Sequence, residues 1–163
     1  MIKALRVDER LIHGQIAMVW SKELGIDGIV VANDETAANE TQQMALKMAV
    51  PSGIKVIIKT VAGAIELVQD PRAEKMKLLI LVRTVHDAVS IAKSVSNILY
   101  MNIGNVGKAV QANKTTFTQF VMLTDEEIAS LKELVQLYPE TALQNVPGDK
   151  RELASSSLKK MNL

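Results

Sequence analysis

The sequence predicts an α/β fold with an open, mostly parallel, twisted sheet of about six to seven strands and helices on both faces. Short apolar runs alternate with helical patterns along the whole chain, which is the order of strand–helix–strand units. Leu78–Val82 is apolar at every position, as in a strand buried on both faces. Hydrophobic residues make up 48% of the chain but aromatic residues only 3%, a composition typical of helix-covered parallel sheets.

The first half of the chain supplies three predicted strands and three predicted helices. Residues 1–5 predict the first strand, and the apolar spacing from Ile16 to Trp20 predicts a helix. A strand at 28–32 is followed by a polar loop at 33–35 and a helix at about 39–49. Turn residues at 51–53 precede a strand at 54–58, and Pro71 ends a helix at 61–69.

The second half continues the alternation. We expect strands at 77–82, 98–101, 117–122 and 141–146, helices at 86–94 and 151–161, and an irregular polar segment at 107–116. Thr124, followed three residues later by Glu127 and then by apolar residues, forms a capping box that opens an amphipathic helix. No internal repeat or change in composition divides the chain, so we expect a single domain over residues 1–163.

The charge, cysteine and histidine counts argue against several classes of function. With 19 basic and 18 acidic residues, the net charge of +1 does not predict a nucleic-acid-binding surface. The absence of cysteine excludes disulfides and thiolate chemistry. Two separated histidines make a poor metal site, and no dinucleotide or P-loop motif appears, so we expect neither a metal nor a cofactor. Without a signal-peptide pattern or a membrane-spanning apolar run, a cytoplasmic location is expected.

The charged stretch at residues 6–15 is the candidate functional site. It follows the first predicted strand, at the edge of a parallel sheet where ligands usually bind, and it leads into a helix whose first N–H groups are free. Arg10 offers a planar fork of donors, and His13 has a nitrogen lone pair that can attack phosphorus. Asp8 is expected to hydrogen-bond one ring nitrogen, and Gly14 to admit a bulky anion. The stretch therefore predicts a phosphoryl site.

Several of these residues have a second interpretation. A histidine such as His13 at a helix start is often only a cap or a surface residue. Trp20 either lies beside the charged loop or fills the core, and the latter is the preferred interpretation. Lys59 and Arg83, at predicted strand ends, either add charge around a phosphate or are solvated. We interpret His86 as a surface residue at the start of a helix.

The stretch 6–15, with Trp20 five positions beyond Gln15, resembles the N-terminal signature of the IIB subunits of the mannose/fructose/sorbose family of the bacterial sugar phosphotransferase system. The similarity continues through residues 31–35, 51–53, 101–104, 123–127 and 144–147, and so covers nearly the whole chain. It implies an α/β phosphocarrier, a phosphotransferase that accepts a phosphoryl group from a phosphohistidine on a IIA domain. The group then passes to a sugar that enters through membrane IIC and IID subunits, so transient association with the inner face of the membrane is implied.

The resemblance also implies roles for individual residues. The phosphorylated histidine of the family corresponds to His13, and its phosphate-cradling arginines correspond to Arg6 and Arg10. Asp8 matches the acidic position that would orient the ring, and Gln15 matches by position.

Two questions stay open at this level. Family members often carry paired glycines where this chain has Gly104 followed by Asn105, and asparagine tolerates the left-handed backbone better than most residues. Whether Asn105 lines the site is undecided. Leu11, Ile12 and Met18 either contribute to a partner surface or, in the case of the first two, anchor the loop. The alternative function is a non-catalytic regulatory module that binds a phosphorylated small molecule through the same arginines.

Overall fold

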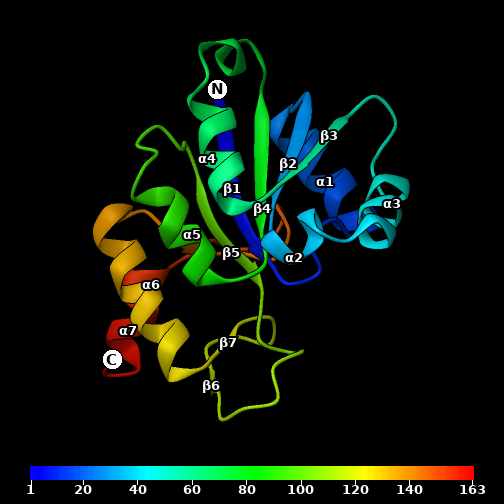
Figure 1. The fold of residues 1–163 in the computed structure, drawn as a ribbon. Helices are drawn as coiled ribbons and strands as arrows, with labels where there is room; N and C mark the ends of the chain where they lie inside the picture. Colours follow the sequence, from blue (N-terminus) through cyan, green and yellow to red (C-terminus); the bar gives the residue numbers. More distant parts are fainter.

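The computed structural model describes residues 1–163 and contains a twisted, mostly parallel sheet between two layers of helices (Figure 1). The sheet has seven strands in the order β3-β2-β4-β1-β5-β8-β9, which confirms the predicted fold class. All neighbouring pairs are parallel except β8 and β9. The strands are β1 (Ile2–Asp8), β2 (Gly28–Ala32), β3 (Lys55–Lys59), β4 (Leu78–Val82), β5 (Met101–Asn105), β8 (Ala142–Leu143) and β9 (Glu152–Leu153).

The helices bury the two faces of the sheet in separate apolar clusters. The larger cluster lies under α4 (Val61–Gln69), α5 (Val85–Ala92), α6 (Asp125–Leu137) and α7 (Ala154–Lys160), and the smaller one includes α1 (Gly14–Leu24). The remaining elements are α2 (Asp34–Ala37), α3 (Glu40–Met48), the 3-10 helix η1 (Pro71–Lys75) and the hairpin of β6 (Thr115–Thr116) with β7 (Met122–Leu123).

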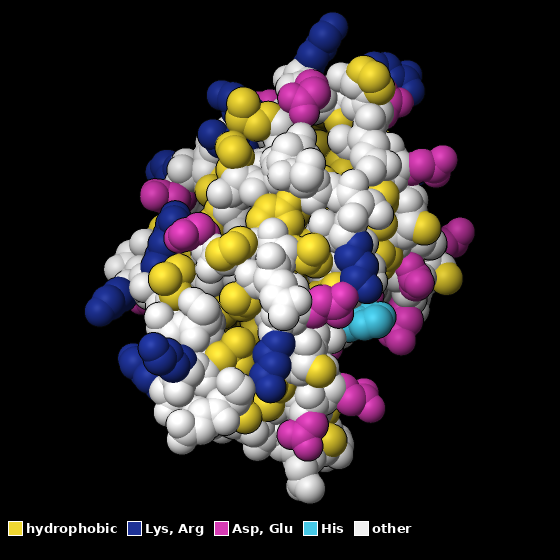
Figure 2. Space-filling view, turned by 90° about the vertical axis from the view of Figure 1, so that its left-hand side faces the viewer, with side chains coloured by type: hydrophobic (Ala, Val, Ile, Leu, Met, Phe, Trp, Pro, Cys, Tyr) yellow, Lys and Arg dark blue, Asp and Glu magenta, His cyan; other side chains and the backbone are white.

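Strand β4 shows why an uninterrupted apolar run predicts a strand that is buried on both faces. Leu78, Ile80 and Val82 pack into the larger cluster, whereas Leu79 and Leu81 pack into the smaller one. Successive side chains of a strand point to opposite faces, so a strand covered on both sides needs apolar residues throughout. The side of the molecule on which α5 and α6 lie carries both acidic and basic side chains (Figure 2).

Several predicted element boundaries are wrong. β1 runs on to Asp8, so Arg6 and Asp8 belong to the strand rather than to a loop. The strand expected at 98–101 lies at 101–105, a short helix occupies most of the loop expected at 33–35, and the strand expected at 141–146 is only two residues long. The C-terminal helix starts at Ala154 because residues 152–153 first pair with β8.

The strand expected at 117–122 is also wrong, because a tight turn interrupts it. The Thr118 hydroxyl oxygen accepts hydrogen bonds from the N–H groups of Phe120 and Val121, at 3.0 and 3.1 Å. A threonine side chain that bonds to the backbone in this way favours a turn over an extended strand. Of the predicted strand, only Met122 therefore pairs as part of a strand, the two-residue β7 (Met122–Leu123).

The start of α6 is confirmed, but only half of its capping box forms. The Thr124 hydroxyl accepts the N–H of Glu127 at 3.2 Å. The Glu127 carboxylate does not return to Thr124 and instead accepts the N–H groups of Val85 and His86, at 2.7 and 3.2 Å. Glu127 therefore caps the neighbouring helix α5 and ties it to α6. None of the helices combines the length and the apolar character that crossing a membrane requires.

Candidate functional site

The loop that carries His13 (residues 9–13, the His13 loop) follows β1, the central strand of the sheet. It lies at the carboxyl-terminal ends of the parallel strands. The chain turns sharply at Leu11, whose φ is 60°, and the Leu11 N–H donates to the Asp8 carbonyl at 2.8 Å. A left-handed leucine costs about 1–3 kcal/mol and persists only where the surroundings enforce it. Here Leu11 and Ile12 are buried in the core, so they anchor the loop, whereas Met18 is exposed on α1.

His13 is exposed at the amino end of α1. It is the N-cap residue, with φ −130° and ψ 111°, and its side chain makes no capping hydrogen bond. Its carbonyl accepts the first helical hydrogen bond, from Ala17 at 2.9 Å. Gly14 and Gln15 beside it are exposed as well, and the first turn has no acidic side chain. The imidazole is thus free to react, at a helix end where the dipole favours negative charge.

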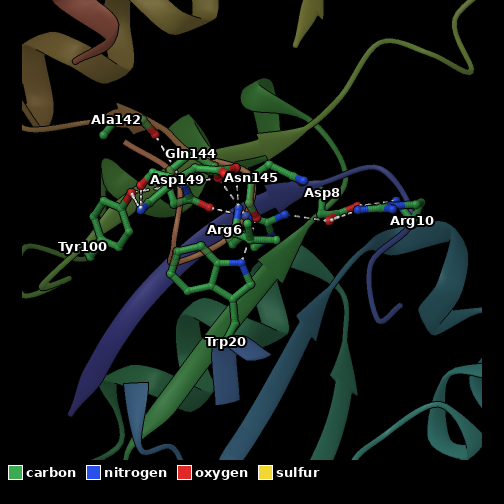
Figure 3. Close-up of polar contacts among 11 residues, drawn as sticks. Arg6, Asp8, Arg10, Trp20, Tyr100, Ala142, Gln144, Asn145 and Asp149 are labelled. Atoms are coloured by element: carbon green, nitrogen blue, oxygen red, sulfur yellow. Dashed lines mark hydrogen bonds and ion pairs between the residues drawn. The ribbon is translucent and has the colours of Figure 1, made fainter. Parts of the chain in front are cut away.

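The Asp8 carboxylate holds two arginines, one on each side (Figure 3). It accepts Arg6 Nη2 at 3.1 Å, and from Arg10 it accepts the backbone N–H, Nε and Nη2, each at 3.0 Å. The structure therefore differs from the expectation that Asp8 orients the ring of His13, because every hydrogen bond to this carboxylate comes from an arginine. Two positive charges around one negative charge leave the group positively charged.

Arg6 is buried, with 2% of its side chain exposed. Its Nη1 donates to Asn102 Oδ1 at 2.7 Å and to the Gln144 carbonyl at 3.1 Å, and the guanidinium carbon lies 5.3 Å from the centre of the Trp20 ring. Burial lowers the pKa of Arg6, although the negative charge of Asp8 opposes this effect. The expectation that Arg6 cradles a phosphate does not fit this position, since its guanidinium is closed off from solvent. Arg6 braces Asp8 instead.

Arg10 is the arginine that faces outward, with a third of its side chain exposed. Its paired hydrogen bonds to Asp8 raise its pKa and hold the guanidinium in one orientation. No partner in the structure occupies Nη1. Of the two predicted phosphate ligands, Arg10 alone combines a fixed charge with accessible donors.

A buried hydrogen-bond network that was not predicted from the sequence supports Arg6. The Asn102 amide donates to the Tyr100 hydroxyl at 3.2 Å and to the Gln144 carbonyl at 3.0 Å, and the Tyr100 hydroxyl donates to Gln144 Oε1 at 2.7 Å. Gly104 leaves room for this arrangement, because a Cβ at that position would overlap the guanidinium of Arg6. Asn102 at the end of a predicted strand was the available signal for this network.

The remaining candidates lie outside the site or support it. Trp20 is buried and donates Nε1–H to the Asn145 carbonyl at 3.0 Å, which confirms core packing. His86 is exposed at the start of α5, as expected, and Lys59 ends the edge strand β3, three strands away from β1. Asn105 is buried in β5, and its backbone is not left-handed. In the segment after β5 the residue with positive φ is Gly107, at 101°.

Residues 2–163 match the family model described as the PTS system sorbose subfamily IIB component. A probable phosphotransferase enzyme IIB component from Streptococcus pyogenes serotype M6 is 48% identical over 148 residues, which cover 89% of this chain and 90% of the relative. A sorbose-specific EIIB component of Lacticaseibacillus casei is 34% identical, over 91% of this chain and 90% of the relative. The crystal structure of the IIBSor domain of the sorbose permease from Klebsiella pneumoniae superposes with a TM-score of 0.90 at 28% identity, covering 98% and 97% of the two chains.

Proposed function

Because the chain belongs to the sorbose subfamily of phosphotransferase-system IIB components, we propose that it carries a phosphoryl group on His13 from a IIA domain to a sugar. The observation that supports this most strongly is the exposed side chain of His13, free of any capping bond, at the amino end of α1. The loop that carries it also holds the partly exposed Arg10. A nucleophile and a fixed positive charge thus share one short loop.

The first step is attack by an imidazole nitrogen of His13 on the phosphorus of the phosphohistidine of IIA. A new N–P bond forms on His13 as the N–P bond of the donor breaks, and the donor, which carries a proton on its other ring nitrogen, leaves as a neutral imidazole. Phosphoryl transfer needs in-line positioning and neutralisation of charge on the phosphoryl oxygens. Arg10 supplies charge and donors in a fixed direction, and the exposed amino end of α1 at Gly14 and Gln15 supplies backbone N–H groups.

The second step passes the phosphoryl group to a sugar that arrives through the membrane IIC and IID subunits. A sugar hydroxyl attacks phosphorus, an O–P bond forms, the N–P bond breaks, and the hydroxyl proton is released to water. His13 returns to its starting state, so the protein is a carrier that is not consumed. The carrier works in the cytoplasm and binds the membrane subunits only transiently.

Labelling by a phosphorylated IIA domain tests this function. Wild-type protein should take up one phosphate per chain, and His13→Gln should take up none. His86→Gln is the matched control, since His86 is the other histidine and is also exposed at a helix start; it should label normally. If wild type is not labelled by an active donor, and if it binds a sugar phosphate as well as His13→Ala does, a regulatory binding module is the better account.

A further inference from the structure

The N–H, the carbonyl and the carboxylate of Glu9 all form hydrogen bonds at the carboxyl-terminal end of the sheet. Its N–H donates to the Asn105 carbonyl at 2.8 Å, and its carbonyl accepts Arg83 Nε at 3.1 Å. It sits between Asp8 and Arg10, so these bonds hold the chain at the point where β1 passes into the His13 loop. Arg83 follows β4 and Asn105 ends β5, so Glu9 links the two strands that flank β1.

The carboxylate of Glu9 lies in a ring of backbone donors. The N–H groups of Gly107 and Ala109 donate to Oε1 at 3.1 and 3.3 Å, and that of Lys108 donates to Oε2 at 3.1 Å. The left-handed Gly107 suits this arrangement, since successive N–H groups in a turn that changes hand form a concavity that binds an anion. A Cβ at position 107 would overlap the Met122 carbonyl, so only glycine fits at this position of the ring.

Packing gives this segment little support of its own. Residues 108–113 are exposed, and Glu9, Arg83 and Gly107 line an open hollow of about 840 Å³. The hydrogen bonds to Glu9 join the segment directly to the start of the His13 loop, while Lys114 Nζ holds the Gly107 carbonyl from elsewhere at 2.6 Å. Hydrogen bonds to a charged acceptor are about twice as strong as neutral ones, which suits a carboxylate to this task.

We propose that Glu9 is a positioning residue for phosphoryl transfer: by binding segment 107–109 it fixes the start of the loop that carries Arg10 and His13. The inference rests on the proposed function of His13. It does not require Glu9 to touch the phosphoryl group. Misplacement of a reacting group by about 1 Å can slow a reaction about a hundredfold, so a loosened loop should lower the rate without removing the nucleophile.

Single-turnover labelling by excess phosphorylated IIA tests the proposal with Glu9→Gln. This variant keeps the shape of the side chain but turns an NH2 group toward backbone N–H donors. We expect the rate constant to fall about tenfold, while the final labelling stays at one phosphate per chain. A folding defect would act differently, because it lowers the final labelling and leaves the rate constant of the folded molecules unchanged. A wild-type rate constant in Glu9→Gln would overturn the proposal.

Glu127→Gln is the matched control. Glu127 also accepts two backbone N–H groups and also lines the hollow, but its partners are Val85 and His86 in α5 rather than the His13 loop. It should therefore label at the wild-type rate. Equal slowing of both variants would mean that the effect is general loosening of this edge of the sheet, and it would contradict a specific role for Glu9.

Amide hydrogen exchange separates failure of this inference from failure of the proposed function, since it needs no phosphorylation. In Glu9→Gln, exchange should accelerate at Lys108 and Ala109 and also at Arg10 and Leu11. Unchanged exchange at the last two residues would overturn the proposal even if wild type is not labelled. Should Glu9→Gln not fold, Arg83→Gln removes the bond to the Glu9 carbonyl from the other side and should accelerate exchange at the same loop residues.

Discussion

Arg6 and Asp8 form an ion pair at 3.1 Å in which neither side chain has more than 2% of its surface exposed. The pair lies within β1, two residues apart in the sequence and on one side of the strand. Asp8 in turn holds Arg10, so a buried charge sets the direction of an exposed one. The outer arginine thereby depends on the inner pair.

Asp8→Asn should lower the free energy of unfolding by about 3 kcal/mol, because breaking a buried ion pair leaves Arg6 charged without a counter-charge. Urea denaturation measures this change. Asp70→Asn is the control, since the Asp70–Arg72 pair has the same spacing but lies on the surface, and it should change stability little. Similar small losses in both variants would show that the inner pair does not stabilise the fold.

Arg10→Lys should fold normally and transfer phosphoryl groups at least tenfold more slowly. Lysine keeps the positive charge but lacks the planar fork in which Nε and Nη2 each bond to one oxygen of Asp8 and so fix the direction of the remaining donors. The measurement is the single-turnover rate of labelling by phosphorylated IIA. An unchanged rate would mean that charge alone suffices and that the orientation set by Asp8 is irrelevant.

Gly104→Ala should destabilise the protein by about 1–3 kcal/mol, the usual cost of overpacking, because its Cβ would overlap the guanidinium of Arg6. Gly148→Ala is the matched control: no atom lies within 4 Å of its added Cβ, and its φ is not positive. Thermal unfolding of both variants gives the comparison. Equal melting temperatures would show that Arg6 moves aside at no cost.

The stability contributed by Glu127 should decrease as pH rises. Burial raises the pKa of its carboxyl group, against the opposing effect of the Val85 and His86 N–H groups. The folded state therefore holds the proton more tightly than the unfolded state does. Between the ordinary and the raised pKa, the unfolding free energy then falls with increasing pH.

The measurement for Glu127 is the difference in unfolding free energy between wild type and Glu127→Gln, taken from about pH 4 to about pH 7. The unfolding free energy of wild type should fall relative to that of Glu127→Gln as the pH rises above the ordinary glutamate pKa. Above the raised pKa the difference should stay constant. The charge of Asp87 also raises the pKa of Glu127, so the difference includes the interaction between these two carboxyl groups. A difference that grows with pH would mean that the backbone N–H groups outweigh burial.

Local patterns predicted most of the fold. The apolar run in β4, the alternation of elements and the capping residue Thr124 each depend on nearby residues, and each was confirmed. The errors at 117–122 and 151–161 each come from specific hydrogen bonds, a local turn in the first case and a strand pairing in the second. A turn bond from Thr118 and a pairing of residues 152–153 with β8 determine these elements, and period and propensity do not reveal such contacts.

The same distinction applies to the site. His13, Arg10 and Asp8 were predicted as site residues because they are crowded into one short charged stretch at the end of the first strand. The place of Arg6 could not be found in this way, because its partners Asn102 and Gln144 are 96 and 138 residues away in sequence. Whether an arginine is buried depends on the assembled sheet. In the folded protein Arg6 is closed off from solvent, so it binds Asp8 and is not available to a phosphate.

We propose above that His13 itself carries the phosphoryl group. The most direct test is to incubate the purified protein with phosphoenolpyruvate, the general phosphotransferase proteins and a cognate IIA, and then to map the modified peptide and its acid lability. We expect one acid-labile phosphate per chain, on His13. An acid-stable phosphate, or a phosphate on any other residue, would contradict it.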